Sequence, residues 1–213
     1  MLRIIVMQSI WSDTRRSPSS KNNGHRSPFE HDYDRLLFST PVRRLADKTQ
    51  VFPLDKSDAV RTRLTHSHEV ANLARSMGNR LIHQGFEFTD IPNQRDVPTI
   101  LATIGLAHDL GNPPFGHQGE AAIGNWFKNH SDVFIDENNI DQSIPGYLKD
   151  EFLKFEGNAQ AFRILTHLQV ALGGFGLDLT AATLASLMKY PVTCDKISDS
   201  SVCTKKYGFF ESE

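Results

Sequence analysis

The sequence predicts an all-α fold, and three observations lead to this prediction. Apolar residues recur every three or four positions over several long segments, which is the spacing of one helix face. Strict alternation of apolar and polar residues, the pattern of a half-buried strand, is not found, and neither is an internal repeat. Glycine and proline fall between the periodic segments, where they end helices. A packed layer of helices is therefore expected.

The expected helices are placed by their periodicity and by the residues that end them. They cover residues 33–46 with a break at Pro41, 59–84, 97–110, 117–130, 159–172 and 180–189. In the long helix at 59–84, the spacing of His66, Val70, Leu73 and Met77 predicts the buried face.

Polar segments are expected to connect and flank these helices. Residues 12–28 are rich in Ser, Arg, Pro and Asn, which indicates a flexible N-terminal arm over residues 1–31. The remaining residues, 32–213, are enough for one domain with a sizeable core. Within it, residues 131–157 are polar and predict a long loop or lid, and residues 191–213 predict an irregular tail.

Two helix starts carry a recognisable cap. Asn158 stands just before the segment at 159–172, and Thr180 stands at the start of the last helix. Asn and Thr side chains accept hydrogen bonds from the free amides of a first helical turn, so both are expected as N-caps.

The composition and net charge limit the kinds of binding partner that are expected. The formal net charge is −2, with 39% hydrophobic and 23% charged residues, as in ordinary globular proteins. No global field attracts nucleic acid or an anionic membrane, so any anion site must be local. The apolar start before Asp13 is short and lacks a cleavage site, so neither a signal peptide nor a membrane span is expected. Cys194 and Cys203 are too few for a disulfide framework, and reduced thiols in a cytoplasmic protein are expected.

The pair His108–Asp109 is the sharpest chemical feature. It ends an apolar helix, just before a Gly-Asn-Pro-Pro turn. An imidazole and a carboxylate together suit a borderline divalent metal, and the negative end of a helix favours a cation. Alternatively, the His completes the helix surface and the Asp ends the helix, and the dipeptide alone favours this alternative.

Arg63 and His66 form a second candidate pair. They lie three residues apart on one helix, so both side chains emerge on the same side. His beside Arg suits a metal ligand next to a phosphate clamp, because guanidinium binds phosphate oxygens in a bidentate fork. The alternative is a core His beside a surface Arg. His68 lies about 200° further round the helix and is expected to be structural.

His117 and Glu120 form a third pair at the start of a helix. They share a face, and a carboxylate that orients an imidazole is a common general acid–base arrangement. The alternative is a solvated first turn, where Glu is favourable in any case. The eight-residue separation from Asp109, across a rigid Pro-Pro turn, favours the catalytic interpretation.

Together these residues are similar to the HD-domain superfamily and resemble, more closely, the bacterial deoxyguanosinetriphosphate triphosphohydrolases. The matching stretches, in the order of the family, are residues 32–35, 43–45, 48–52, 61–67, 108–117, 155–160 and 206–210. They spread over nearly the whole chain. The resemblance implies that the all-α fold is an HD-domain helical bundle.

The resemblance implies a divalent metal centre held by His66, His108 and Asp109. Mn²⁺ or Mg²⁺ is the expected cofactor, with Fe²⁺, Ni²⁺ and Zn²⁺ as alternatives. The family has a fourth ligand, an aspartate in a helix that follows the stretch at 206–210. The sequence ends at residue 213, before that helix, so it is expected to be the N-terminal portion of a longer enzyme.

The resemblance also implies roles around the metal. His117 would be the catalytic acid or base, held by Glu120. Arg63 and Lys206 would contact phosphate, and Gln50 would meet the deoxyribose.

The implied reaction is metal-dependent hydrolysis of a deoxynucleoside triphosphate (dNTP), with dGTP as the first guess, to deoxynucleoside and inorganic triphosphate. A regulatory dNTP or single-stranded DNA is a further candidate partner, and a homo-oligomer such as a hexamer is expected. Two alternatives stay open: an HD phosphodiesterase or nucleotidase acting on other nucleotides, and an inactive nucleotide-sensing or nucleic-acid-binding regulator. Gln50 and Arg63 favour the triphosphate. The missing fourth ligand favours the regulator, whereas the His117–Glu120 pair argues against it.

Overall fold

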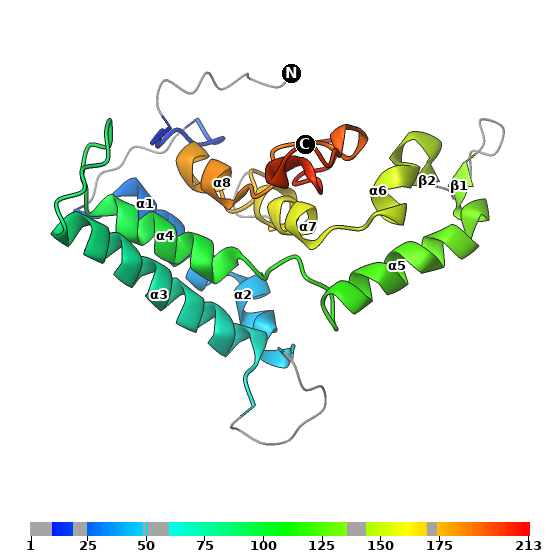
Figure 1. Ribbon diagram of the computed structural model, residues 1–213, viewed down its shortest axis with the longest axis horizontal. Helices are drawn as coiled ribbons and strands as arrows, with labels where there is room; N and C mark the ends of the chain where they lie inside the picture. Colours follow the sequence, from blue (N-terminus) through cyan, green and yellow to red (C-terminus); the bar gives the residue numbers. More distant parts are fainter. Residues whose placement is uncertain (1–9, 19–24, 49, 51–59, 136–143, 170–173) are drawn as a thin grey trace.

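The computed structural model describes residues 10–18, 25–48, 50, 60–135, 144–169 and 174–213, and these are mostly helical (Figure 1). In chain order the helices are α1 (Pro28–Leu37), α2 (Thr40–Arg44), α3 (Arg63–His83), α4 (Asp96–Ala107), α5 (His117–Asn129), α6 (Lys149–Leu153), α7 (Gly157–Arg163) and α8 (Ala181–Leu187). Two strands of two residues each, β1 (Phe134–Ile135) and β2 (Ile144–Pro145), pair in parallel. The all-α prediction is confirmed.

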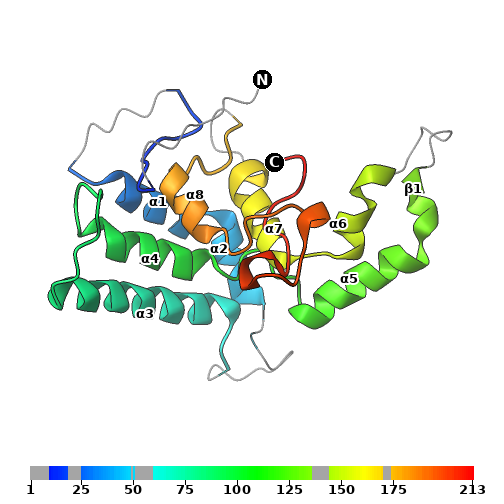
Figure 2. The ribbon, with the colours of Figure 1, turned by 45° about the horizontal axis from the view of Figure 1, so that its top comes forward.

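The hairpin of α3 and α4 is the centre of the fold. The two helices run antiparallel and make the most extensive contact between elements, and α1 and α8 both pack against α4 (Figures 1 and 2). Helix α5 leads away from this hairpin to α6 and the strand pair, which lie on the other side of the molecule. The main core joins α1, α2, α4 and the segments around α7 and α8 through its buried leucines: Leu36, Leu45, Leu106, Leu110, Leu165, Leu177 and Leu179.

The predicted buried face of the long helix is wrong. Leu73 and Met77 on α3 are 63% and 66% exposed. The side that packs against α4 carries small residues instead: a Cβ added at Gly105 of α4 would lie only 2.7 Å from the Cα of Ala71. The two backbones approach closely because neither contact position carries a large side chain, so close packing, not side-chain hydrophobicity, sets the rotation of α3.

The described residues of the expected N-terminal arm, 10–18 and 25–31, pack more closely than predicted. Helix α1 begins at Pro28, with Ser27 as N-cap in a capping box, so the expected boundary at residue 31 falls inside a helix. Arg15, from the expected arm, is buried and lies 2.6 Å from the carboxylate of Asp32. Asp32 also accepts hydrogen bonds from the backbone amide and the hydroxyl of Thr180. This buried pair ties the N-terminal segment to α1 and α8.

The two predicted helix caps have different outcomes. Thr180 is the N-cap of α8, where its side chain accepts from the amide of Thr183, so that prediction is confirmed. The cap at Asn158 is wrong: α7 begins at Gly157, and the Glu156 side chain takes the capping position and accepts from the amide of Asn158. Helix α7 also ends early, at Arg163, and is followed by one π-helical segment over Ile164–Leu168.

The segments expected to be irregular are held by long-range contacts. Residues 131–157, predicted to be a loop, contain β1, β2 and α6, and the residues 136–143 between them lie outside the described part of the chain. Three aromatic rings from α5, β1 and α6 pack together there: Phe127, Phe134 and Phe152. The C-terminal segment has only short 3₁₀ turns, but Tyr207 is buried and donates to the carbonyl of Glu151.

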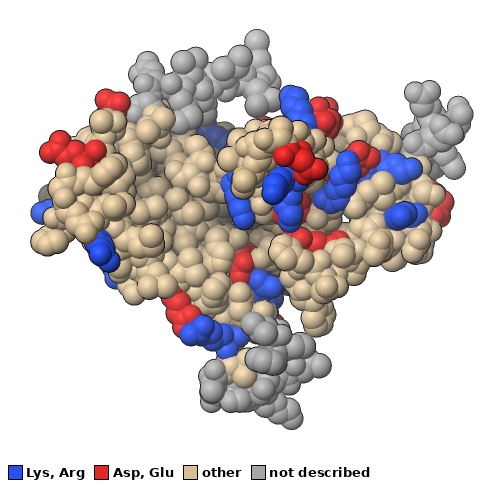
Figure 3. Space-filling model, in the orientation of Figure 1, with Lys and Arg blue, Asp and Glu red and all other residues tan. Residues whose placement is uncertain are grey.

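The described helices include no candidate membrane span, and charges of both signs lie on the face drawn in Figure 3. No described helix combines the length and the apolar composition that crossing a bilayer requires. On the face in Figure 3, Lys and Arg lie among Asp and Glu, in keeping with the small net charge. Cys194 and Cys203 are both free thiols, as predicted.

Candidate metal and phosphate site

Three side chains from two helices converge on one point. Ligand atoms of His66, His108 and Asp109 all lie within 4.8 Å of one another. His66 comes from the first turns of α3, and the other two follow the end of α4, which packs antiparallel against it. The two imidazole rings are 5.2 Å apart between centroids. Two imidazoles and a carboxylate are a donor set that fits a divalent metal of intermediate softness.

Local hydrogen bonds turn these side chains towards the shared point. The Nδ1 atom of His108 lies 2.7 Å from the carbonyl of Gly105, one turn back in α4. A proton on Nδ1 that is donated to this carbonyl leaves Nε2 with a free lone pair, the tautomer that binds metal. Nε2 in turn lies 3.6 Å from the carboxylate of Asp109. The geometry therefore suits a metal ion between the two residues.

The Asp109 carboxylate is buried and held on both oxygens. Arg63 donates to Oδ2 over 2.9 Å, and both side chains are more than 90% buried. The Asn112 amide donates to Oδ1 over 2.6 Å. Lys48 reaches the same turn and donates to the carbonyl of Asn112 over 3.2 Å. Arg63 therefore lies directly beside the metal candidates, and its Nε atom is buried without a hydrogen-bond partner among the described residues.

The His117 and Glu120 side chains meet, as their three-residue spacing predicts. The Nδ1 atom of His117 lies 2.8 Å from Glu120 Oε2, at the first turn of α5. The His117 side chain is 85% exposed, whereas that of Glu120 is only 9% exposed. Glu120 is fixed from behind, because its other oxygen accepts from the backbone amide of Gly157 over 2.9 Å. A buried carboxylate thus orients an imidazole whose free nitrogen faces solvent.

Two glycines allow backbone segments around the site to approach each other closely. Gly116 has φ 56° and ψ −128°, a conformation that L side chains avoid, and a Cβ there would lie 3.2 Å from Nη2 of Arg63. A Cβ at Gly157 would lie 2.9 Å from the Glu120 carboxylate. Arg63 thereby connects the Asp109 side of the site to the turn that precedes His117.

Lys206 and Gln50 are the remaining predicted site residues. The Lys206 ammonium lies 2.6 Å from the carboxylate of Glu156 and 3.8 Å from that of Glu120. It lines, with His117 and Glu120, a cavity of about 390 Å³ to which none of the three metal candidates belongs. Gln50 lies beside the start of α3, where its amide donates to the carbonyl of Arg61, and its side-chain oxygen is buried without a partner in the described structure.

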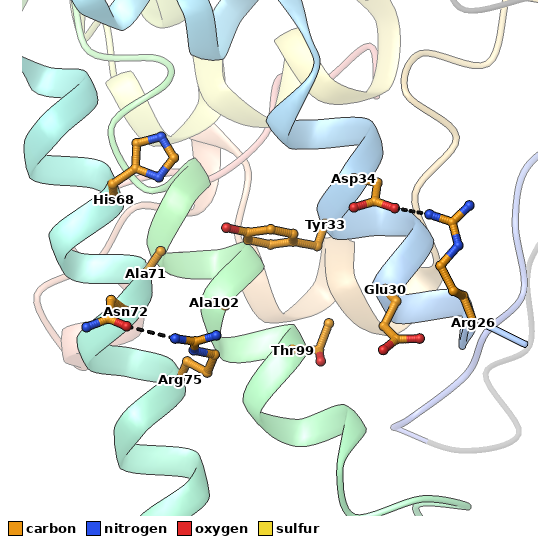
Figure 4. A pocket seen from close by; sticks show the side chains of 10 residues that line it. All are labelled: Arg26, Glu30, Tyr33, Asp34, His68, Ala71, Asn72, Arg75, Thr99 and Ala102. Atoms are coloured by element: carbon orange, nitrogen blue, oxygen red, sulfur yellow. Dashed lines mark hydrogen bonds and ion pairs between the residues drawn. The ribbon is translucent and has the colours of Figure 1, made fainter.

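His68 points away from this site, as its place on the helix predicts. It lines a separate cavity of about 420 Å³ between α1, α3 and α4, with Tyr33 across the middle and Arg75 on the α3 wall (Figure 4). Arg75 donates there to the side chain of Asn72, and Arg26 pairs with Asp34 on the opposite wall.

Sequence reasoning assigned no role to three residues that hold the site. Lys48 and Asn112 extend the Asp109 network, and Glu156 pairs with Lys206. Asn112 had a local signal, because it follows Asp109 by three residues in the same turn. Lys48 and Glu156 had no such local signal, because their partners Asn112 and Lys206 lie 64 and 50 positions away along the chain.

Comparisons with known proteins agree with this architecture. Residues 63–152 match the HD domain family, a match that includes all three metal candidates and the His117–Glu120 pair. A Listeria monocytogenes protein named deoxyguanosinetriphosphate triphosphohydrolase-like is 44% identical over 96% of this chain. Proteins of the same name from Pseudomonas aeruginosa and Synechocystis are 42% and 44% identical, each over 88% of this chain. The chain spans 46%, 42% and 44% of the lengths of these three relatives.

Proposed function

We propose, on the premise that this chain belongs to the HD-domain family, that it forms the metal-binding part of an enzyme that hydrolyses dNTPs to deoxynucleoside and inorganic triphosphate. The observation that carries the proposal is the convergence of His66, His108 and Asp109 beside the buried guanidinium of Arg63. A metal and a phosphate clamp side by side suit a phosphorylated substrate. The names of the relatives point to dGTP as the first substrate to try. The location that we propose is the cytoplasm.

The metal would be a divalent ion such as Mn²⁺ or Mg²⁺, held by the two imidazoles and the carboxylate. When bound, it supplies a Lewis acid that polarises a phosphoryl oxygen and lowers the pKa of water. Arg63 would bind a phosphate oxygen through its guanidinium group while Nη1 stays on Asp109. Gln50, next to Arg63 through the pairing of their backbone segments, would contact the deoxyribose.

The His117–Glu120 pair would serve the leaving group. Water attacks the α-phosphorus, and the bond to the nucleoside 5′-oxygen breaks. His117, protonated on the nitrogen that faces solvent, would give its proton to that oxygen, while Glu120 stabilises the imidazolium through Nδ1. Lys206, beside Glu120 and in the same cavity as His117, would bind a phosphate oxygen of the departing triphosphate.

Product analysis tests the reaction. The protein is incubated with each dNTP and Mn²⁺, and the products are separated by anion-exchange chromatography. The proposal predicts inorganic triphosphate and deoxynucleoside in equal amounts. Pyrophosphate with a monophosphate, or orthophosphate alone, would indicate a phosphodiesterase or nucleotidase instead. Tight nucleotide binding without any product would indicate a regulator.

A variant separates acid catalysis from metal binding. His117→Ala is expected to lower turnover by about 10²–10⁴-fold, the usual contribution of a positioned acid, and to leave the Mn²⁺ content unchanged. His83→Ala, an exposed histidine at the end of α3, is the matched control and keeps wild-type turnover. Full activity of His117→Ala would refute the assignment.

A further inference from the structure

Lys48 brings an excess of positive charge to the Asp109 turn. It lies just after the short 3₁₀ turn at Leu45–Asp47, and its backbone carbonyl accepts from the amide of Arg63 over 2.8 Å. This backbone pair fixes Lys48 next to Arg63, at the start of α3. The Lys48 side chain is half-buried, and within the described part of the chain it donates to a neutral group, the carbonyl of Asn112.

The charges around Lys48 do not balance. Burial lowers the pKa of the Lys48 ammonium, the neighbouring guanidinium groups of Arg63 and Arg44 lower it further, and only Asp109 acts in the opposite direction. Arg63 already pairs with Asp109. Within the described residues, no carboxylate comes within ion-pair distance of Lys48. Among the described residues, Lys48 thus has two guanidinium neighbours and only one carboxylate, which already pairs with Arg63, an arrangement that an incoming anion would stabilise.

The number of phosphoryl groups that the site can bind follows from the positions of its cationic groups. One phosphoryl group held by a metal at His66, His108 and Asp109 also meets Arg63, which lies against Asp109. Lys48 reaches the same turn through the backbone carbonyl of Asn112, whose side chain donates to Asp109. An ammonium is a compact point charge with three donors, so it can bind a second phosphoryl group while it keeps its bond to the Asn112 carbonyl.

We propose that Lys48 binds a non-bridging oxygen of the β- or γ-phosphate and so makes the site prefer triphosphates over monophosphates. The inference rests on the proposed function, because it assigns a role within the same site. A monophosphate would be held at the metal candidates and Arg63, and would leave Lys48 without a phosphate partner. A charge-assisted hydrogen bond contributes about 1.5–3 kcal/mol, so loss of the contact should weaken triphosphate binding by about 10- to 100-fold.

The test compares two nucleotides on matched variants. Calorimetry in Mn²⁺ measures binding of dGMP and of a dGTP analogue with an imido bridge between the α- and β-phosphates. Lys48→Gln removes the charge but keeps a donor for the Asn112 carbonyl, Lys48→Arg keeps the charge, and Lys128→Met alters an exposed lysine in the last turn of α5. Lys48→Gln is expected to weaken analogue binding 10- to 100-fold while dGMP binding stays within about twofold. Lys48→Arg and Lys128→Met are expected to bind the analogue almost as the wild type does.

Three results would overturn the inference. Unchanged binding of the analogue by Lys48→Gln, with normal wild-type binding, removes Lys48 from the phosphate site and leaves the proposed function intact. An equal loss for both nucleotides, with a lower melting temperature, means that Lys48 only supports the turn at Asn112. Failure of the wild type to bind either nucleotide refutes the proposed function together with the inference. Should Lys48→Gln fail to fold, Lys48→Met is measured by the same ratio of analogue to dGMP affinity.

Discussion

Replacing Arg63 by Met tests how the site balances its charges. The guanidinium and the Asp109 carboxylate are 2.9 Å apart, with side chains only 6% and 9% exposed. Methionine keeps most of the length and the apolar stem but removes the positive charge. The variant therefore leaves a buried carboxylate with the Asn112 amide as its nearest remaining donor.

The expected cost follows from that burial. Removing one partner of a buried ion pair costs about 3–5 kcal/mol, because the other charge stays desolvated without compensation. For a chain of this size, each kcal/mol lowers the melting temperature by about 2–4 °C, so a fall of roughly 6–20 °C is expected without metal. A divalent cation at His66, His108 and Asp109 would restore a positive charge beside the carboxylate, and the loss should then be clearly smaller.

Urea unfolding of the wild type and of Arg63→Met measures the free energy of unfolding, once in EDTA and once in saturating Mn²⁺. Arg75→Met is the matched control: Arg75 is exposed and bonds only to Asn72 among the recorded contacts, so its loss should change stability by no more than about 0.5 kcal/mol. A destabilisation of Arg63→Met that is the same in EDTA and in Mn²⁺ would refute the idea that the cation and Arg63 share the Asp109 charge.

Three further substitutions test other parts of the structure. Gly157→Ala places a Cβ 2.9 Å from the Glu120 carboxylate, so turnover should fall at least tenfold, and wild-type kinetics would contradict the close approach. Burial raises the pKa of Asp178, but hydrogen bonds and the Arg35 ion pair outweigh this effect and leave the pKa below its ordinary value. This carboxylate thus stabilises the fold above its unfolded pKa of about 3.9, and the stabilisation is lost as pH falls through the lower folded value. Asp178→Asn should flatten that acid limb in denaturation measured from pH 5 to 2, and an unchanged slope would count against the shift. Leu73→Gln, on the exposed side of α3, should leave stability within about 0.5 kcal/mol, whereas a loss above 2 kcal/mol would mean that this face is covered.

Local patterns predicted the parts of the site that local structure builds. His66 falls on one helix, and His108 and Asp109 stand at the end of the next, so local patterns marked them as candidates. Their joint role as metal ligands came from the family resemblance. The His117–Glu120 pair also has a local origin, a three-residue spacing on α5. His108 and Asp109, in contrast, lie just after the end of α4, and His66 belonged to the predicted face of α3 that the structure does not confirm.

Long-range packing determined the buried face of α3 and the N-cap of α7, the two features that local sequence patterns predicted wrongly. The apolar spacing of Leu73 and Met77 indicated a buried face, but the small residues Ala71 and Gly105 let α3 and α4 approach on another side. The capping position before α7 went to Glu156 instead of Asn158, because its side chain is held between that helix start and Lys206. Such choices depend on which segments meet, which no single stretch of sequence encodes.

The most direct measurement is an anomalous diffraction map of crystals soaked in Mn²⁺. We predict one peak within about 2.0–2.3 Å of ligand atoms from His66, His108 and Asp109, the usual distance for imidazole and carboxylate bound to a divalent metal. The peak should disappear in His108→Ala crystals grown and soaked in the same way. A peak bound elsewhere on the chain, or none between these three side chains, would contradict the metal centre and, with it, the proposed hydrolase.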